Sequence, residues 1–287
     1  MRHILTTLLT LIPLLAGAVM PGEVRWHNQA ADTTRITQIL IEASQLSNPT
    51  PGRLMSEIGR KFIGTPYEAS TLEGTPEQLT VNLDGLDCTT FVETVAAMAL
   101  TIEEGRNSWQ DFLYNLENIR YRQGRIDGYA SRLHYISDWI VDNTHRGNIT
   151  EVTDRVPGVG YVVKTLDFMS ANRDKYPALA DSTQYARIKG CEQGYRSHRF
   201  PYVKSGPLQG KNIAGWFQDG DIIAFTTKVK GLDISHMGII VMEGGQPRLL
   251  HASSRAGRVQ IDPLTLGEYL KKNPSISGAR IIRLAPR

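Results

Sequence analysis

The sequence predicts an α+β fold, with helices in the first half of the chain and an antiparallel sheet in the second. Up to about residue 146, apolar residues recur at the three- and four-residue intervals of amphipathic helices. From about Phe200, they form short runs joined by Gly, Pro and Asp turns, which is typical of antiparallel strands. A chain of 287 residues that is 41% hydrophobic and 21% charged has ample material for a globular core.

The first residues contain the three parts of a secretory signal peptide. Arg2 supplies the basic start, an apolar run follows, and small residues end at Ala18, where we expect cleavage. The sequence therefore predicts a signal peptide at 1–18, a flexible lead-in at 19–33 and a single domain at 34–287. No later stretch approaches the roughly 20 uninterrupted apolar residues of a membrane span, so we expect a periplasmic or secreted protein.

The net charge is modest, at +3 with the histidines neutral, and loss of Arg2 with the signal peptide would lower it by one. This balance does not provide the basic footprint that nucleic-acid-binding proteins carry, so nucleic acid is not an expected partner. We expect no cofactor, and we expect the protein to be a monomer.

Two helices are expected before the most informative part of the chain. The first is indicated by the spacing of Ile36, Ile39, Leu40 and Ala43. The second is indicated by Leu54, Ile58, Phe62 and Ile63, and it closes at the segment Gly64-Thr65-Pro66-Tyr67. Tyr67 is thereby placed just past a helix end.

Cys88 is expected in the first turn of a third helix. Asp87 is a suitable N-cap residue, and one apolar face follows the cysteine, formed by Phe91, Val95, Met98, Ala99 and Ile102. The backbone N–H groups and the dipole at a helix start stabilise a thiolate, so we expect the pKa of Cys88 to lie below the free value of about 8.5. A nucleophilic cysteine has these properties.

Two less active interpretations of Cys88 remain open. A buried cysteine is usually inert. In an exported protein, two cysteines also commonly form a disulfide, and Cys191 is the only other cysteine in the chain.

Two further helices are expected in an insertion at about 106–146, packed beside the cysteine. The first runs from Trp109 to Tyr121, and the second carries Arg132, His134 and Tyr135. We expect these three residues to contact substrate, with Arg132 reaching out from the first helical turn to a carboxylate or amide. The alternative is that Arg132 forms a surface ion pair with Asp127 or Asp138.

The second half of the chain is expected to form the sheet. Residues 147–180 give no clear pattern, and 182–194 are weakly helical. The predicted strands are 200–203, 221–225, 236–241, 248–252, 259–261 and 279–284.

Two histidines lie in neighbouring strands of this sheet. His236 opens one strand and His251 lies in the next, with residues 243–247 as the turn between them. Side chains near facing positions of a hairpin can touch, so His251 can orient His236 as a base for the Cys88 thiol. Zinc is the competing use of paired histidines, but no ligand motif with typical spacing accompanies them.

Four segments together resemble a known family. These are Gly64-Thr65-Pro66-Tyr67, Asp87-Cys88-Thr89-Thr90-Phe91-Val92, Ser235-His236-Met237-Gly238-Ile239-Ile240 and Leu250-His251-Ala252. In order and spacing they are similar to the signature segments of NlpC/P60 cysteine peptidases, which have a papain-like core. The segment from Ser131 to Trp139 and the sequence after Cys88 resemble one branch more closely, DUF1460, whose members are N-acetylmuramoyl-L-alanine amidases.

The resemblance implies roles for individual residues. Cys88 would be the nucleophile, His236 the base and His251 the orienting residue. Tyr67 and Asp87 would line the site beside the sulfur, with Ser235 near the substrate. The substrate would be peptidoglycan or its muropeptide fragments, cut between N-acetylmuramic acid and L-alanine.

Two departures from the broad superfamily argue against its commoner cleavage between D-glutamate and diaminopimelate. Thr89-Thr90 follows the cysteine where Ser-Gly is commoner, and minimal members lack the helical insertion. Endopeptidase cleavage of the stem peptide nevertheless stays open. So does a wall-binding module without catalytic activity.

Overall fold

The computed structural model describes residues 23–210 and 212–287, so the predicted signal peptide lies outside the described residues. The helices of the described chain are α1 Gln29–Ser44, α2 Pro51–Arg60, α3 Cys88–Glu103, α4 Trp109–Arg120, α5 Ile136–His145, α6 Phe168–Ala171, α7 Ser182–Gly194, α8 Ser205–Leu208 and α9 Leu266–Lys272. The strands are β1 Arg25–Trp26, β2 Thr80–Val81, β3 Ile149–Glu151, β4 Val159–Val163, β5 Arg199–Lys204, β6 Ile222–Thr227, β7 Ile234–Glu243, β8 Gln246–Ser253, β9 Arg258–Thr265 and β10 Ile276–Leu284.

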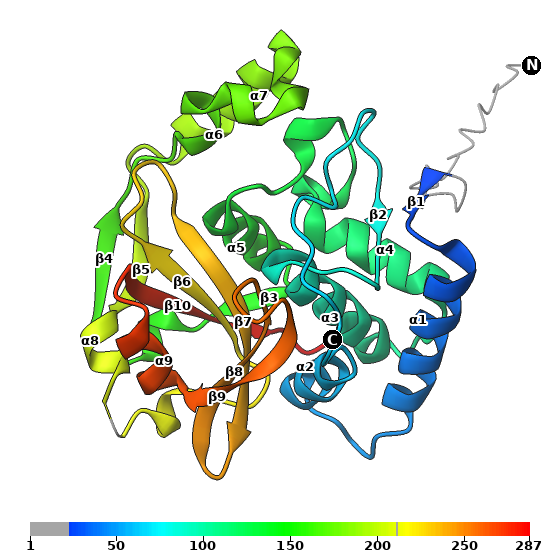
Figure 1. Ribbon diagram of the computed structural model, residues 1–287, viewed down its shortest axis with the longest axis vertical. Helices are drawn as coiled ribbons and strands as arrows, with labels where there is room; N and C mark the ends of the chain where they lie inside the picture. The colour runs from blue at the N-terminus through cyan, green and yellow to red at the C-terminus, as the bar shows by residue number, and fades with distance from the viewer. Residues whose placement is uncertain (1–22, 211) are drawn as a thin grey trace, which may run out of the picture.

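An eight-stranded antiparallel sheet forms the centre of the fold. Its strand order is β4-β5-β10-β6-β7-β8-β9, and β3 pairs with β10 outside this path. Figure 1 shows α1 to α5 gathered on one side of the sheet, with α8 and α9 on the other. The predicted α+β class is confirmed, and each of the six predicted strands is present.

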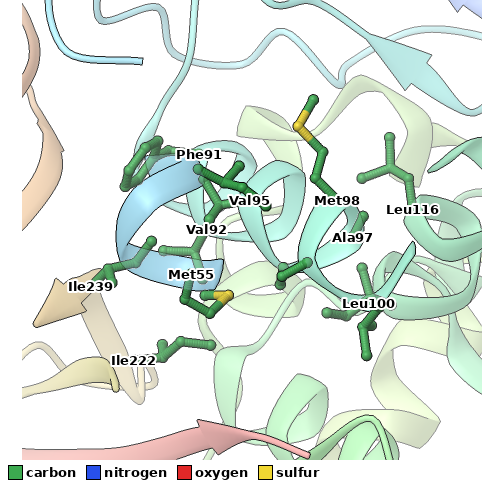
Figure 2. Close-up of a cluster of buried hydrophobic side chains, with 14 of the residues drawn as sticks. Met55, Phe91, Val92, Val95, Ala97, Met98, Leu100, Leu116, Ile222 and Ile239 are labelled. Atoms are coloured by element: carbon green, nitrogen blue, oxygen red, sulfur yellow. The ribbon is translucent and has the colours of Figure 1, made fainter. Parts of the chain in front are cut away.

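Helix α3 is the centre of the larger hydrophobic core. The sequence predicted one buried face, but the side chains from Thr90 to Thr101 are all buried. Helices α2 and α4 and the sheet cover α3 from different sides, and Figure 2 shows Phe91, Val95 and Leu100 pointing in different directions into this packing. A helix buried all round needs apolar or small residues on every face, which the Ala96-Ala97 pair supplies.

Of the predicted flexible lead-in at 19–33, the structure describes residues 23–33, which form β1 and the start of α1. Strand β1 pairs in parallel with β2, and α1 begins at Gln29. The Asn28 side chain accepts a hydrogen bond from the N–H of Ala31, which caps the helix. Asp32 in the first turn is buried, and its carboxylate accepts a hydrogen bond from the N–H of Leu83. This bond connects α1 to the segment that follows β2.

Helices α4 and α5 belong to the same core as α3. Phe112 and Leu116 of α4 and Trp139 of α5 are each buried in it. The helix predicted around Arg132 begins later than expected, at Ile136, after a short 3-10 turn at Tyr129–Ser131. Strands β3 and β4 lie within residues 147–180, for which no element was predicted.

The β7–β8 hairpin forms as predicted and sets the register of the two histidine-bearing strands. Its two turn residues, Gly244 and Gly245, have φ angles of +57° and +73°, which residues with side chains adopt at a cost. Ile239 consequently pairs with Leu250 across the ladder. Within the described part of the chain, no helix is long and apolar enough to cross a membrane.

Candidate active site

The start of α3 is fixed by a capping box at Asp87. The Asp87 carboxylate accepts hydrogen bonds from the N–H groups of Thr89 and Thr90, at 3.0 and 2.7 Å. In return, the Thr90 hydroxyl accepts from the N–H of Asp87 at 2.9 Å. The predicted cap is confirmed, and it places Cys88 at the first helical position.

The pKa of Cys88 moves in the direction opposite to the prediction. Burial, with a smaller contribution from the neighbouring Asp87 carboxylate, raises the pKa of the thiol to about 11, because both disfavour a thiolate. Hydrogen bonds from the backbone N–H of Met237 and from Thr89 act the other way without reversing the shift. The helix start alone therefore does not lower the pKa of Cys88, and these surroundings favour the protonated thiol.

The two histidines contact each other directly. His236 Nε2 and His251 Nδ1 are 2.7 Å apart, and the ring planes are nearly perpendicular, at 79°. Continuing the hairpin register places Gly238, and not His236, opposite His251, so the two rings meet along the diagonal. A Cβ at Gly238 would lie 3.0 Å from the Cβ of His251 and 2.9 Å from the Leu250 carbonyl oxygen. Because Gly238 has no side chain, the His236 and His251 rings have space to contact each other.

Asp262 on β9 extends the pair to a row of three residues, which the sequence did not predict. Its Oδ2 lies 3.7 Å from His251 Nε2, within ion-pair range but longer than a hydrogen bond. If His251 carries its proton on Nε2, facing this carboxylate, its Nδ1 accepts from His236 Nε2–H. The remaining nitrogen of His236, Nδ1, is then an unprotonated base.

His236 is held neutral by its surroundings. Burial lowers its pKa to about 3, with a smaller contribution in the same direction from His251. Its ring stacks on Phe225 with an interplanar angle of 4° and a centroid distance of 6.2 Å. The two shifts together favour a neutral imidazole at His236 and a neutral thiol at Cys88.

Two tyrosines lie close enough to Cys88 to interact with it electrostatically. Burial raises the pKa of Tyr67, and Cys88 and Asp87 add to the shift. Burial likewise raises the pKa of Tyr269 to about 12, and Tyr269 also packs edge-on against the His251 ring at 5.8 Å. Both phenols therefore stay protonated and can donate hydrogen bonds.

A cavity of about 410 Å³ opens on the two histidines. Ser235 lines it and is exposed, and the remaining wall is largely polar, with Gln260, Asn273 and Lys272 among its side chains. Because His236 itself lines this cavity, a ligand that fills it would contact the His236 side chain.

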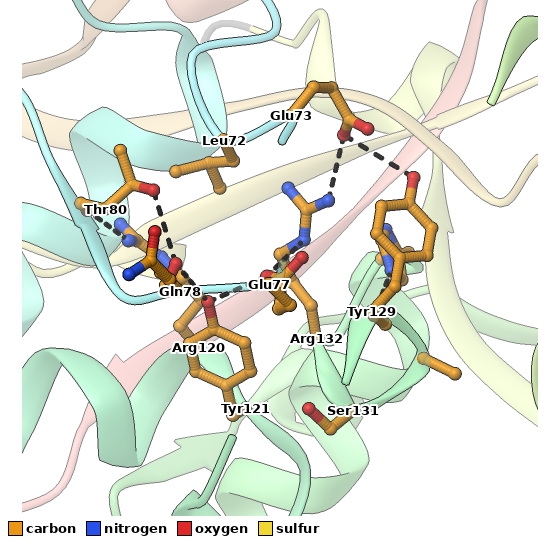
Figure 3. A network of polar contacts seen from close by, with 12 residues as sticks. Leu72, Glu73, Glu77, Gln78, Thr80, Arg120, Tyr121, Tyr129, Ser131 and Arg132 are labelled. Carbon is orange, nitrogen blue, oxygen red and sulfur yellow. Dashed lines mark hydrogen bonds and ion pairs between the residues drawn. The ribbon is translucent and has the colours of Figure 1, made fainter. Parts of the chain in front are cut away.

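Arg132 occupies a different environment from the one predicted. Its side chain is 7% exposed and pairs with Glu73 at 2.9 Å and with Glu77 at 3.3 Å, and not with Asp127 or Asp138. Figure 3 shows it pointing into this network together with Tyr129. The physical reason is that Arg132 precedes α5 and has its carboxylate partners in the loop before β2.

His134 and Tyr135 are also held by internal contacts. His134 Nε2 lies 2.9 Å from the carbonyl oxygen of Tyr129, and burial keeps its pKa well below the usual value. The Tyr135 hydroxyl donates to Glu192 at 2.8 Å and accepts from the N–H of Met169. None of the three residues predicted to bind substrate from this segment lines the cavity at the histidines.

Both cysteines are free, so the alternative of a disulfide between Cys88 and Cys191 is excluded. Cys191 lies on α7, where its sulfur accepts a hydrogen bond from Arg122 at 3.1 Å. Within residues 23–210 and 212–287, no group of three or more His, Cys, Asp and Glu side chains is arranged to hold a metal ion.

Comparison with solved structures finds close likenesses. An N-acetylmuramoyl-L-alanine amidase from Bacteroides uniformis ATCC 8492 is 39% identical, with a TM-score of 0.76, and the match covers 82% of this chain and 98% of that one. A protein from Bacteroides fragilis, named as a candidate xylanase, is 41% identical, with a TM-score of 0.73 and coverage of 79% and 99%. A Legionella pneumophila protein of family DUF1460 is 24% identical with a TM-score of 0.67, over 90% and 97% of the two chains, and shows the likeness of the fold alone.

Comparison with curated proteins gives no match. Comparison with family models matches residues 57–277 to the family described as AmiA-like, N-acetylmuramoyl-L-alanine amidase-like. The match includes Cys88, both histidines and Asp262. By this match and by the Bacteroides likeness, the chain belongs to the N-acetylmuramoyl-L-alanine amidase-like family.

Proposed function

We propose that the protein is an exported cysteine amidase of the DUF1460 branch of the NlpC/P60 superfamily, with a papain-like core. It hydrolyses the amide between N-acetylmuramic acid and L-alanine in peptidoglycan or muropeptides. The observation that carries the proposal is the 2.7 Å contact between His236 and His251, with His236 next in sequence to Met237, whose N–H meets the Cys88 sulfur. Membership of the amidase-like family supports the choice of bond.

The raised pKa of Cys88 and the lowered pKa of His236 favour a mechanism in which the proton moves as the bond forms. Nδ1 of His236 takes the thiol proton while the sulfur attacks the lactyl carbonyl carbon, so the charged pair exists only along the reaction coordinate. The resulting imidazolium is stabilised by His251 and, beyond it, by Asp262. It then protonates the departing nitrogen of L-alanine, leaving a muramoyl thioester on Cys88. A water molecule, deprotonated by His236, hydrolyses the thioester and regenerates the thiol.

The oxyanion of the tetrahedral intermediate needs hydrogen-bond donors near the sulfur. The backbone N–H of Cys88 is free of helical pairing because it belongs to the first turn. The Tyr67 hydroxyl is the second donor that we propose, since it lies near the sulfur and stays protonated. Asp87 acts through the cap and does not touch the oxyanion.

Two functions compete with this proposal. Cleavage between D-glutamate and the diamino acid would use the same thiol on another bond, and a wall-binding module would use the cavity without turnover. Glycoside hydrolysis, which the name of the Bacteroides fragilis protein raises, generally requires a pair of carboxyl groups. The residues described around the histidine cavity include a single one, Asp262.

Product analysis of a purified muropeptide that still carries its sugar tests the proposal. Release of an intact stem peptide beginning with L-alanine is the expected result. Release of a truncated stem would instead identify an endopeptidase, and binding without turnover would identify a wall-binding module.

A further inference from the structure

A second cavity lies beside the candidate active site and has no role in the proposed reaction. It has a volume of about 550 Å³ and is bounded by β4, β5, β10 and β6, the strands on one side of β7 in the sheet. These strands lie together at the left of Figure 1. Ile276 borders both this cavity and the histidine cavity, so the two are adjacent.

The cavity reaches close to the nucleophile. Ile234, at the start of β7, lines its wall, and Met237, whose N–H meets the Cys88 sulfur, is three residues further along the same strand. Because a strand advances by about 3.3 Å per residue, the cavity begins roughly 10 Å from the reacting sulfur. Two residues of extended peptide span about 7 Å, and a lysine side chain covers the remaining few ångströms, so a lysine of this cavity can meet a carboxylate on the second residue of a substrate peptide that leaves the scissile bond.

The charge of the lining is strongly positive. Three lysines border the cavity, Lys164, Lys204 and Lys228. Lys164 interacts electrostatically with Asp233, whereas Lys204 and Lys228 form no ion pair with a carboxylate of the described chain. The fourth cation, Arg280, is neutralised by Glu151 at 2.8 Å. The single carboxylate of the lining, Asp233, accepts a hydrogen bond from the N–H of Ser137.

Two of the lysines are exposed and can meet a ligand. These are Lys204 and Lys228, of which Lys228 also donates to the carbonyl oxygen of Pro274 at 3.3 Å, whereas the ammonium group of the half-buried Lys164 donates to the carbonyl oxygen of Thr227 at 2.5 Å. Phe200 and Tyr202 supply an apolar and aromatic floor below them. An occupant with carboxylates at its edge and aliphatic carbon in its interior matches this lining.

We infer that this cavity, hereafter the lysine cavity, binds the stem peptide of the substrate through a carboxylate beyond L-alanine. The inference rests on the proposed function for the identity of the substrate. In a muramoyl peptide the N-acetylated sugar is uncharged, because its lactyl carboxyl group is in the amide, and every carboxylate lies on the peptide. The uncompensated lysines therefore select the peptide side of the scissile bond, and the sugar lies toward the polar histidine cavity.

The test compares two substrates that differ in one charge. One is N-acetylmuramoyl-L-alanyl-γ-D-glutamyl-diaminopimelate, and the other has the α-carboxylate of its D-glutamate converted to an amide. For the double variant Lys204→Met, Lys228→Met, kcat/KM on the carboxylate substrate is expected to fall by about tenfold to a hundredfold, mainly through KM. The loss on the amide substrate is expected to be at least several-fold smaller.

Two control variants make the comparison specific. Lys230→Met removes an exposed lysine of the same turn that does not line the cavity, and it is expected to leave both substrates unaffected. Lys272→Met removes a lysine of the histidine cavity. If Lys272→Met, and not the double variant, lowered kcat/KM more on the carboxylate substrate than on the amide substrate, the stem peptide would lie in the histidine cavity and the inference would be overturned. Equal losses of kcat/KM on the two substrates for the double variant would also overturn it.

A binding measurement separates this inference from the proposed function. Calorimetry with the free tripeptide L-alanyl-γ-D-glutamyl-diaminopimelate and the Cys88→Ala variant requires no turnover. We expect binding that the two lysine substitutions weaken at least tenfold. Absent binding, or binding that the substitutions leave unchanged, overturns the inference even if the wild type releases intact stem peptide. Binding that responds as expected, in an enzyme that cuts another bond, refutes the proposed function alone.

Discussion

At the scale of single residues, the proposed mechanism begins from the Cys88 thiol, whose surroundings favour its protonated form. Because Cys88 has a pKa raised to about 11, the fraction of thiolate at pH 7 is small and rises tenfold with each pH unit below that value. In a Cys191→Ser background, the rate of alkylation of Cys88 by iodoacetamide should therefore climb steadily from pH 7 to pH 10. A plateau below pH 7 would show a preformed thiolate–imidazolium pair, and so contradict the neutral resting state.

The nucleophile itself gives a second prediction at this scale. Cys88→Ala should lose turnover by more than about a hundredfold, since the loss of a nucleophile is normally far larger than that. The substitution leaves the Asp87 cap intact, so the circular dichroism spectrum and the melting temperature should stay close to those of the wild type. A well-folded variant that retains more than a hundredth of the activity would exclude thiol attack.

The two histidines should differ in their importance. His236→Ala removes the base, whereas His251→Ala removes the residue that orients it, so the first should lower kcat more than the second. Kinetics at a single pH with both variants decide the order. Equal losses would mean that the 2.7 Å contact makes the pair act as one unit, and a larger loss for His251→Ala would reverse the assigned roles.

Part of this geometry was predictable from the sequence and part was not. The turn at Gly244 and Gly245 can be recognised from the local sequence, and it pairs the two strands that carry His236 and His251. The closeness of the two histidines was therefore predictable. The diagonal offset between them, and the space at Gly238, depend on register. Asp262 lies on β9, whose pairing with β8 includes a register shift between Arg248 and Leu250, so no local pattern placed its carboxylate beside His251.

At the scale of elements, the buried side chain of Arg120 joins α4 to α3 and to β2. Arg120 on α4 pairs with Glu93 on α3 at 2.6 Å, and both side chains are 2% exposed. The guanidinium also donates to the carbonyl oxygen of Thr80 in β2 at 2.7 Å. The Arg120 side chain thus connects α4 with α3, the helix that carries Cys88, and with β2. Figure 3 shows its contact with Thr80.

Removal of that side chain should therefore cost stability. Arg120→Met leaves the Glu93 carboxyl group buried without its partner, and we expect the free energy of unfolding to fall by about 3 to 5 kcal/mol. Arg187→Met is the matched control, because Arg187 pairs with Asp127 at the surface, where the two side chains are 38% and 80% exposed. That control should change stability by about 0 to 1 kcal/mol. Urea denaturation of both variants tests the difference, and similar losses would contradict it.

The prediction that placed Arg132 in the first turn of a helix was wrong. A helix pattern read from sequence placed its start near Ser131, where an arginine would reach into solvent. The chain instead passes through a 3-10 turn and begins α5 at Ile136, so Arg132 faces Glu73 and Glu77. These partners are more than 50 residues away in sequence, and long-range pairing of this kind leaves no local signal.

At the scale of the whole molecule, the sequence predicted the order of helices and sheet, and the central strands, because period and turn chemistry are local properties. It missed β3 and β4 at the far side of the sheet, where short strands are specified by their neighbours more than by their own pattern. It also missed the lysine cavity, whose lining comes from strands far apart in the chain.

The central claim is that the Cys88 thiol attacks the carbonyl of the muramoyl–L-alanine amide. The most direct measurement is the mass of the acyl-enzyme, trapped by rapid acid quenching with a muropeptide and mapped to a proteolytic fragment. We expect the fragment that contains Cys88 to gain the mass of an N-acetylmuramoyl group, because the peptide is the leaving group. An adduct that contains L-alanine and D-glutamate, or an adduct on a residue other than Cys88, would contradict it.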